Sequence, residues 1–284
     1  MDAPVTPASS PWQASLSLAF TDDAGTTRLT ERSHYGPLRV QKPLYPEHPS
    51  VCHAIVIHPP GGVVGGDQLS IAARAGERAR AFLTTPGAAK WYRANGRISR
   101  QDIKLEAAAG ATLEWLPQET IFFNGAQVEL DTSIELDATA CFIGCDILCF
   151  GRTASGESFD SGTVAQRTSV RLGGRLVWFE QGMLHGGGEA MRSPLAMAGK
   201  TVCATLIAVG KPAAINATLV AAIRDQADPE QLPHFGVTQM KSVLVARYLG
   251  DSSETARRMM TRVWQQLRPA LLGRDAIVPR IWNT

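Results

Sequence analysis

Apolar and polar residues alternate along much of the first two thirds of the chain. Leu16, Leu18 and Phe20 alternate with small or polar residues, which is the period-two pattern of a strand with one buried face. Gly173 and Gly174 separate two further strand-like runs by the two residues that a tight hairpin turn requires. Similar short runs, separated by Gly, Pro or Asn, continue to about position 180. The pattern predicts a mainly β fold.

Two segments of this β-rich part echo one another. Residues 80–86 (RAFLTTP) and 111–117 (ATLEWLP) place their apolar residues alike and end at proline, 31 residues apart. Other β-rich runs occupy Val51 to Ile57 and Cys141 to Phe150. A repeat of this length is typical of coils that stack on one another. We therefore expect stacked or β-helical strands in two layers.

The C-terminal part changes to a helical pattern, with one strand between two predicted helices. The first helix is predicted for residues 213–226 and the strand for Met240 to Tyr248. The second helix is predicted to begin with capping-box-like spacing at Asp251–Glu254 and to end at Pro269. Its apolar face comprises Ala256, Met259, Met260, Val263, Trp264 and Leu267. The opposite, arginine-rich face is expected to be solvated or to dock a partner.

Composition excludes several classes of protein. Hydrophobic residues make up 44% and charged residues 19% of the chain, which is not the composition of a disordered protein. A net charge of +2 with scattered Lys and Arg gives no reason to expect nucleic-acid or membrane partners. Residues 1–11 lack periodicity and predict a flexible tail before a single domain over residues 12–284. No signal peptide or membrane-length apolar segment is recognisable, and five cysteines is an odd number, so cytoplasmic localisation is expected.

No complete catalytic or nucleotide-binding signature is present. Residues 194–201 (PLAMAGKT) end like a P-loop but begin with proline, and the β-branched residues that follow predict a strand. The six histidines show no HExxH spacing. Cys141, Cys145 and Cys149 are four residues apart, which on a strand separates neighbours by roughly 13 Å. Three such thiols cannot bind one metal ion, and we expect them to be buried.

A glycine-rich run and three acidic residues remain as candidates for function. Gly61, Gly62, Gly65 and Gly66 predict two tight turns, and Asp67 follows them directly. Asp67 could either cap a turn or face a polar channel.

Asp146 and Glu180 lie in or beside apolar strand-like runs, where a carboxylate needs a partner. We expect Arg152 or a backbone N–H to be the partner of Asp146. Alternatively, Asp67 and Glu119 could act as the acid and base of a β-helical hydrolase.

Seven segments, in order, resemble the urease accessory protein family UreD, also called UreH. They are GPLRVQKPLYPE (36–47), HPPGGVVGGD (58–67), LTTPGAAKWYR (83–93), WLPQETIFFNGA (115–126), DILCFGR (146–152), VLVARYLG (243–250) and PRIWNT (279–284). Together they span most of the chain. The resemblance implies a mainly β fold with a small helical part, no enzymatic activity and no intrinsic cofactor.

The resemblance also implies partners and a role. Members of this family act as scaffolds that bind apo-urease, recruit UreF and through it the GTPase UreG, and assist nickel insertion into urease. On that footing Asp67, Asp146 and Glu180 are candidates to line a polar path for nickel, because carboxylates and water release this ion more readily than thiolates do. The candidates for structural or partner-contact roles are Gly61, Gly62, Gly65, Gly66, Glu119, Arg152, Arg280 and Trp282. A structural adaptor without a metal path is the alternative.

Overall fold

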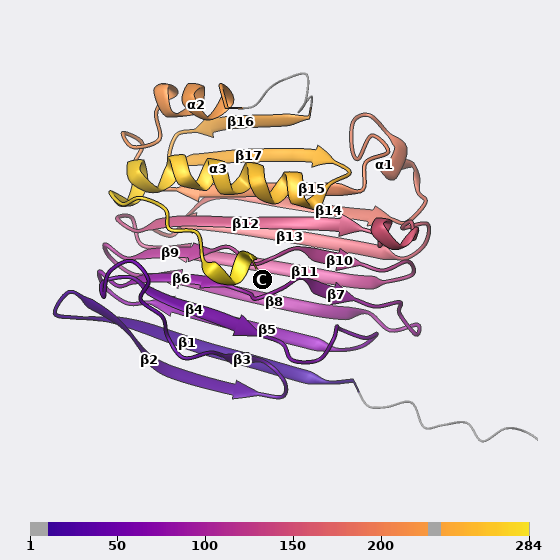
Figure 1. The fold of residues 1–284 in the computed structure, drawn as a ribbon, viewed down its shortest axis with the longest axis horizontal. Coiled ribbons are helices and arrows are strands. Elements are labelled where there is room, and N and C mark those ends of the chain that lie inside the picture. The colour runs from indigo at the N-terminus through magenta and orange to yellow at the C-terminus, as the bar shows by residue number, and fades with distance from the viewer. Residues whose placement is uncertain (1–10, 227–233, 284) are drawn as a thin grey trace, which may run out of the picture.

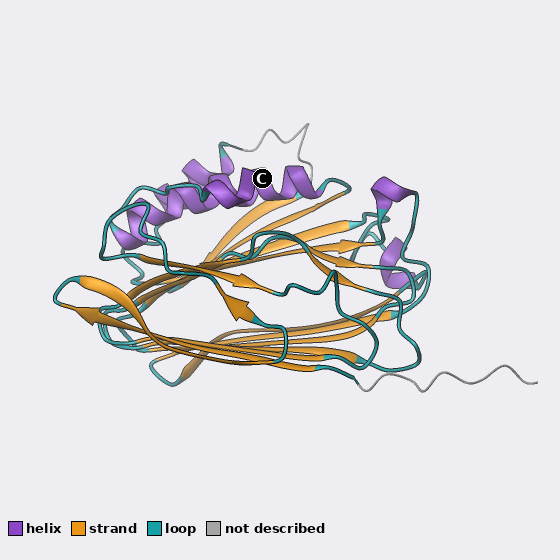
Figure 2. Cartoon of the chain, turned by 60° about the horizontal axis from the view of Figure 1, so that its bottom comes forward, coloured by secondary structure: helices purple, strands orange, loops and turns teal. Residues whose placement is uncertain are grey.

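The computed structural model describes residues 11–226 and 234–283, and its strands form two sheets that face each other (Figures 1 and 2). The seven-stranded sheet contains, in spatial order, β14 (Arg175–His185), β13 (Thr163–Leu172), β11 (Gln127–Leu136), β8 (Ser99–Ala107), β5 (Gln68–Ala75), β1 (Gln13–Asp23) and β2 (Thr26–Tyr35). The ten-stranded sheet contains β16 (Phe235–Met240), β17 (Val243–Gly250), β15 (Val202–Val209), β12 (Cys141–Phe150), β9 (Thr112–Trp115), β6 (Arg80–Thr84), β4 (Cys52–Ile57) and β3 (Arg39–Val40), with β10 (Thr120–Phe122) and β7 (Ala89–Trp91) attached through β12. The predicted mainly β, two-layer fold is confirmed.

The predicted tail, residues 1–11, lies outside the described residues except for Pro11. The assignment of residues 12–284 to one domain stays a prediction.

The middle of the chain forms stacked coils. From β4 to β13 the chain passes repeatedly between the two sheets, and strands of successive coils pair in parallel. In the pair β6 and β9, Arg80 lies opposite Thr112, so the repeat there is 32 residues and the predicted spacing of 31 is one short. A shift by one residue would turn Leu113 away from the core between the sheets, because neighbouring side chains on a strand point to opposite faces.

Two predicted β features are confirmed in detail. Leu16, Leu18 and Phe20 are buried on β1 between more exposed neighbours. Gly173 and Gly174 join β13 to β14 with φ values of +57° and +76°, a conformation that glycine adopts without a steric penalty.

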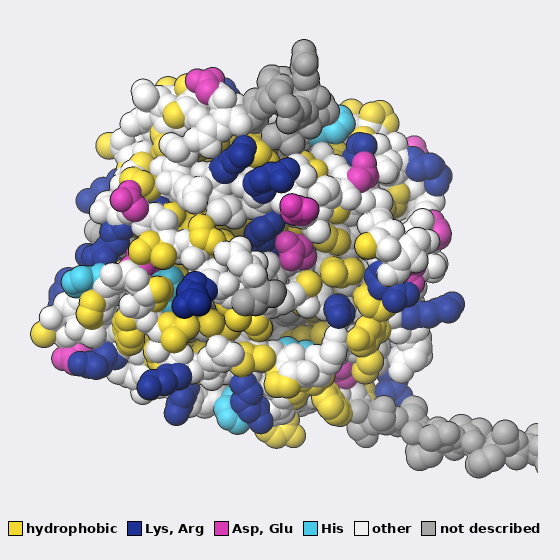
Figure 3. Space-filling model, viewed as in Figure 1, with side chains coloured by type: hydrophobic (Ala, Val, Ile, Leu, Met, Phe, Trp, Pro, Cys, Tyr) yellow, Lys and Arg dark blue, Asp and Glu magenta, His cyan; other side chains and the backbone are white. Residues whose placement is uncertain are grey.

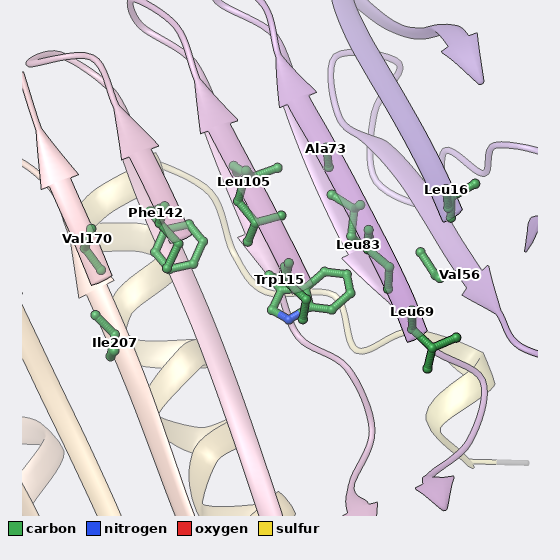
Figure 4. Close-up of a cluster of buried hydrophobic side chains, with 14 of the residues drawn as sticks. Leu16, Val56, Leu69, Ala73, Leu83, Leu105, Trp115, Phe142, Val170 and Ile207 are labelled. Carbon is green, nitrogen blue, oxygen red and sulfur yellow. The ribbon is translucent and has the colours of Figure 1, made fainter. Parts of the chain in front are cut away.

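The hydrophobic core is divided by the ten-stranded sheet. One cluster fills the space between the sheets, where side chains such as Leu16, Leu105 and Phe142 come from strands of both sheets (Figure 4). The other cluster lies between the opposite face of the ten-stranded sheet and the C-terminal helices. A strand such as β12 therefore directs side chains from its two faces into different cores.

The long C-terminal helix α3 (Ser253–Leu272) covers this second core (Figures 1 and 2). All six residues of its predicted apolar face are buried. Ser252 caps the helix, since its side chain accepts a hydrogen bond from the N–H of Thr255, so the predicted cap at Asp251 is one residue early. The predicted end at Pro269 is wrong. Burial of the preceding Leu267 and Arg268 outweighs the lost backbone hydrogen bond, and the helix continues to Leu272, where Gly273 caps it with φ +64°.

The other predicted C-terminal elements are present with shifted limits. Helix α2 (Ala217–Arg224) begins four residues later than predicted because Asn216 caps it, accepting from the N–H of Leu219 at 2.9 Å. The predicted strand Met240 to Tyr248 is wrong as one element. Lys241, with φ +52°, and Ser242 form the turn between β16 and β17.

The remaining short elements are the helix α1 (Glu189–Arg192) and the 3₁₀ turns η1 (Thr153–Ser155) and η2 (Arg280–Asn283). None of the helices in the described ranges combines the length and apolar character that crossing a bilayer requires. On the face that carries α3, Lys and Arg side chains are distributed singly or in small groups (Figure 3).

Candidate functional site

A row of polar side chains crosses the inner face of the ten-stranded sheet. The strand register places Asp146 on β12 opposite Thr205 on β15, and Thr205 opposite Arg247 on β17. Directly opposed residues on neighbouring strands have Cβ atoms about 4.5–5.5 Å apart. The apolar neighbours of these residues on the same face, among them Phe142 and Leu148, belong to the core between the sheets. The row is therefore a polar interruption in an otherwise apolar surface.

A second polar row crosses the facing surface of the seven-stranded sheet. Thr132 on β11 lies opposite Thr168 on β13, and Thr168 lies opposite Glu180 on β14. Ile134 and Val170 on the same face are buried in the core. Both sheets thus carry a polar row, and the two rows face each other.

Two cavities lie between the rows, and both are lined by Asp146 and Glu180. The larger cavity, of about 340 Å³, extends past Cys203, His234 and Arg247. The smaller one, of about 20 Å³, is also lined by Thr132, Thr168, Thr205 and Trp115. A space of that size is large enough for one water molecule. The Trp115 indole N–H is buried and has no hydrogen-bond acceptor among the described residues.

The two acids of this site differ in their partners. Glu180 Oε1 accepts a hydrogen bond from Arg247 Nη2 at 2.7 Å, in an ion pair that joins the two sheets. Asp146 has no hydrogen bond or ion pair with any side chain that the structure describes. Burial, and secondarily the charge of Glu180, raise the pKa of Asp146 from its ordinary value of 3.8 to about 6. An ionised Asp146 therefore costs folding free energy.

Because Asp146 is only partly buried, replacing it with Asn is expected to stabilise the protein by roughly 1–3 kcal/mol at pH 7.5. The folded-state pKa lies above the unfolded one, so between pH 4 and 6 the native state retains a proton that the unfolded state has lost. The advantage of the variant should be complete above about pH 6 and vanish below about pH 4. Urea unfolding of both proteins across this pH range measures the difference in their free energies of unfolding. Equal stability at pH 7.5 would show that the ionised Asp146 does not cost folding free energy.

Asp67 lies in a different environment. Its carboxylate accepts hydrogen bonds from the backbone N–H groups of Trp12 at 2.9 Å and Val64 at 3.1 Å. It lines neither of the cavities bordered by Asp146 and Glu180. Of the two roles considered from the sequence, its contacts are those of a turn cap.

The glycines before Asp67 have the predicted steric role. A Cβ at Gly62 would lie 2.8 Å from the Lys90 carbonyl oxygen, and one at Gly65 would lie 2.9 Å from the Asn95 backbone nitrogen. Gly66 has φ +97°. At Gly61 a Cβ would meet only the Tyr92 hydroxyl, at 3.3 Å. The run therefore allows the chain to turn close to the neighbouring coil.

Comparison with known proteins assigns the family. The family model of the UreD urease accessory protein matches residues 13–283. The chain belongs to the UreD family. It is 67% identical over 273 residues to the urease accessory protein UreD of Janthinobacterium sp. (strain Marseille), covering 96% of this chain and 92% of that protein. It is 55% identical over 278 residues to the UreD of Nitrosospira multiformis, covering 97% of this chain and 99% of that protein.

Three of the UreD-like segments, 83–93, 115–126 and 279–284, meet near the C-terminus. In PRIWNT, the Trp282 indole N–H donates to Thr84 Oγ1 at 2.8 Å. In WLPQET, Glu119 forms an ion pair with Arg257 of α3 at 3.2 Å, and the Arg257 guanidinium lies 5.4 Å from the Trp282 ring centroid. The prediction that the arginine-rich face of α3 is solvated is therefore wrong for Arg257, whose side chain is only 16% exposed. Arg280, in η2, is exposed. These contacts fasten the C-terminal segment to the sheet.

The expected partner of Asp146 was Arg152 or a backbone N–H, and within the described residues neither of them binds its carboxylate. Arg152 bonds Glu157 Oε2 through Nε at 2.9 Å and lies 4.3 Å from the centroid of the Phe123 ring. Strand β12 ends at Phe150 and the chain turns at Gly151, which leads Arg152 away from the strand face that carries Asp146.

Two of the three cysteines on β12 are buried, as predicted. Cys145 and Cys149 are buried in the core beneath α3, and burial raises the pKa of each thiol to about 12. Cys141 is partly buried, and burial raises the pKa of its thiol as well. Within the described ranges, no three His, Cys, Asp or Glu side chains converge on a position that could hold a metal ion. Asp146 and Glu180 thus offer two carboxylates and not a closed coordination shell.

A buried charge network beneath α3 was not predicted from the sequence. Arg268 is fully buried and bonds both Glu114, with Nε–Oε1 at 3.0 Å, and Glu47, with Nη2–Oε1 at 2.7 Å. His53 Nε2 lies 2.7 Å from Glu47 Oε1, and the Trp264 indole donates to Glu114 at 2.6 Å. Burial acts to raise the pKa of Glu47, but hydrogen bonds from His53 and Arg268 outweigh it and hold the pKa below its usual value. The sequence does contain an indication of this network, because Glu114 and Arg268 are charged residues at positions that the strand and helix periodicities assign to the core.

Proposed function

We propose that this chain is a scaffold of urease maturation in the cytoplasm that also provides a polar path for nickel. In this role it binds apo-urease and UreF, and through UreF the GTPase UreG. GTP hydrolysis is carried out by UreG and not by this chain. Membership of the UreD urease accessory family supports the role in urease maturation. The observation that carries the nickel path is Asp146, an unpartnered carboxylate facing Glu180 between two apolar sheets.

The chemistry of the two rows suits an ion in transit. Carboxylates and hydroxyls are oxygen donors, and a divalent metal bound by few of them retains water and exchanges quickly. A carboxylate between apolar sheets costs free energy unless a cation compensates it. Asp146 lacks such a partner in the described protein, and Ni²⁺ in passage would supply one. Asp67 belongs to this proposal only as a residue that shapes the adjoining turn.

The alternative of a hydrolase receives no support from the geometry. Its acid and base would be Asp67 and Glu119, but backbone N–H groups bind the first and Arg257 binds the second. A purely structural adaptor would need only the surfaces that contact its partners. That alternative therefore predicts that replacing Asp146 and Glu180 leaves urease activation unchanged.

The scaffold part is tested by co-expressing the tagged chain with urease subunits, UreF and UreG. We expect UreF and apo-urease to co-purify with the tagged chain, and urease to remain inactive when the chain is omitted. If the chain neither retains UreF nor affects urease activity, the scaffold proposal is wrong. Variants of Asp146 and Glu180 should still retain both partners, because these side chains line the space between the two sheets.

A further inference from the structure

Arg247 is the one cation in the two polar rows. It lies on β17, in line with Thr205 and Asp146, and its guanidinium crosses the space between the sheets to bind Glu180. The rows carry the carboxylates of Asp146 and Glu180 and one guanidinium, so one negative charge has no compensating cation in the rows. The other polar groups that line the larger cavity are Gln166, Cys203, Thr205, His234 and Tyr248.

The contacts of Arg247 allow its guanidinium to move. The Arg247 side chain is 51% exposed and that of Glu180 is 34% exposed, so their ion pair lies at the solvent side of the cavity. Exposed ion pairs stabilise proteins by only about 0–1 kcal/mol, so little is lost when one opens. The Trp178 ring lies 5.8 Å from the guanidinium and offers it an aromatic face. The guanidinium can therefore leave Glu180 without disturbing a packed core.

We propose that Arg247 is a positioning residue that competes with a divalent cation for Glu180 and so sets how tightly the cation is held. In the described structure the guanidinium binds the Glu180 carboxylate. A cation that enters between Asp146 and Glu180 displaces it, and the returning guanidinium favours release. Arginine suits this task because it does not lose its proton in proteins, so the competitor is always charged. The inference rests on the proposed nickel path and adds its regulation.

The test is calorimetric titration of the purified full-length chain with nickel sulfate at low ionic strength. Arg247→Gln should bind Ni²⁺ about tenfold more tightly than the unsubstituted chain, because a positive charge within a few ångströms of the ion is removed. Arg247→Lys, which keeps the charge, should change the affinity much less. Arg167→Gln is the matched control, since Arg167 forms an ion pair with Asp131 on the outer face of the seven-stranded sheet. It should leave the affinity unchanged.

The outcomes separate this inference from the function on which it rests. If Arg247→Gln binds nickel no more tightly while Asp146→Asn weakens binding, the competition is wrong and the path stands. If neither variant changes the affinity, both the competition and the path at these residues are wrong. If the unsubstituted chain and Arg247→Gln both fail to bind nickel, the competition is overturned, and urease activation by the acid variants decides the path separately.

Discussion

Replacing Arg268 with Met is expected to lower the free energy of unfolding by about 3–5 kcal/mol, because it leaves buried carboxylates without their counter-ion. Arg268 is fully buried and bonds both oxygens of Glu114, both oxygens of Glu47 and the carbonyl oxygen of Asp275. Methionine fills much of the volume but supplies none of these hydrogen bonds. The two carboxylates would remain in a space built for a cation.

Urea unfolding followed by tryptophan fluorescence measures this effect. Arg258→Met is the matched control on the same helix, because Arg258 is 54% exposed and pairs only loosely with Glu254 at 3.8 Å. Its loss should change the free energy of unfolding by less than about 1 kcal/mol. A loss at Arg268 as small as that of the control would mean that the network is not needed to hold α3 on the sheet.

The second large effect is expected on urease activation. Combining Asp146→Asn with Glu180→Gln should lower urease activity in cell extracts by at least about 10–100-fold, the loss typical when only the groups that support metal ligands are removed. Both substitutions keep the size of the side chain and remove its charge. Neither should destabilise the fold, and the first should stabilise it.

The matched control is the double variant Asp131→Asn and Glu135→Gln. These two acids lie on β11 of the same seven-stranded sheet and pair with Arg167 and Arg171. The control therefore removes the same number of negative charges from a sheet that carries Glu180, away from the inner rows. Equal losses of activity in the two double variants would assign the effect to net charge and not to the path.

Local features of the fold could be predicted from the sequence. The alternation at Leu16, Leu18 and Phe20 and the pair Gly173–Gly174 report on a single strand and a single turn, and both are confirmed. The strand Cys141–Phe150 has the predicted limits. The predicted end of the helix at Pro269 is wrong, because the hydrophobic periodicity does not show how strongly the residues around Pro269 are buried.

Features that depend on pairing between distant strands could not be predicted. Glu47 and Arg268 are 221 residues apart, and only the stacking of the coils and the docking of α3 bring them together. In the same way, Asp146 and Glu180 could be singled out as acids in apolar strands, but their approach follows from the register of β12, β15 and β17 and of β13 with β14. Arg247 gave no signal of its own, because an arginine on a strand is usually solvated.

The nickel content of urease measures whether Asp146 and Glu180 are needed for nickel delivery. Urease is purified from cells that express UreF, UreG and either the unsubstituted chain or the variant with Asp146→Asn and Glu180→Gln, and its nickel is quantified per active site by atomic absorption. We expect the variant chain still to co-purify with UreF and apo-urease while the urease contains little nickel. Urease with a full complement of nickel in the presence of the variant chain would show that these two acids are not needed for nickel insertion.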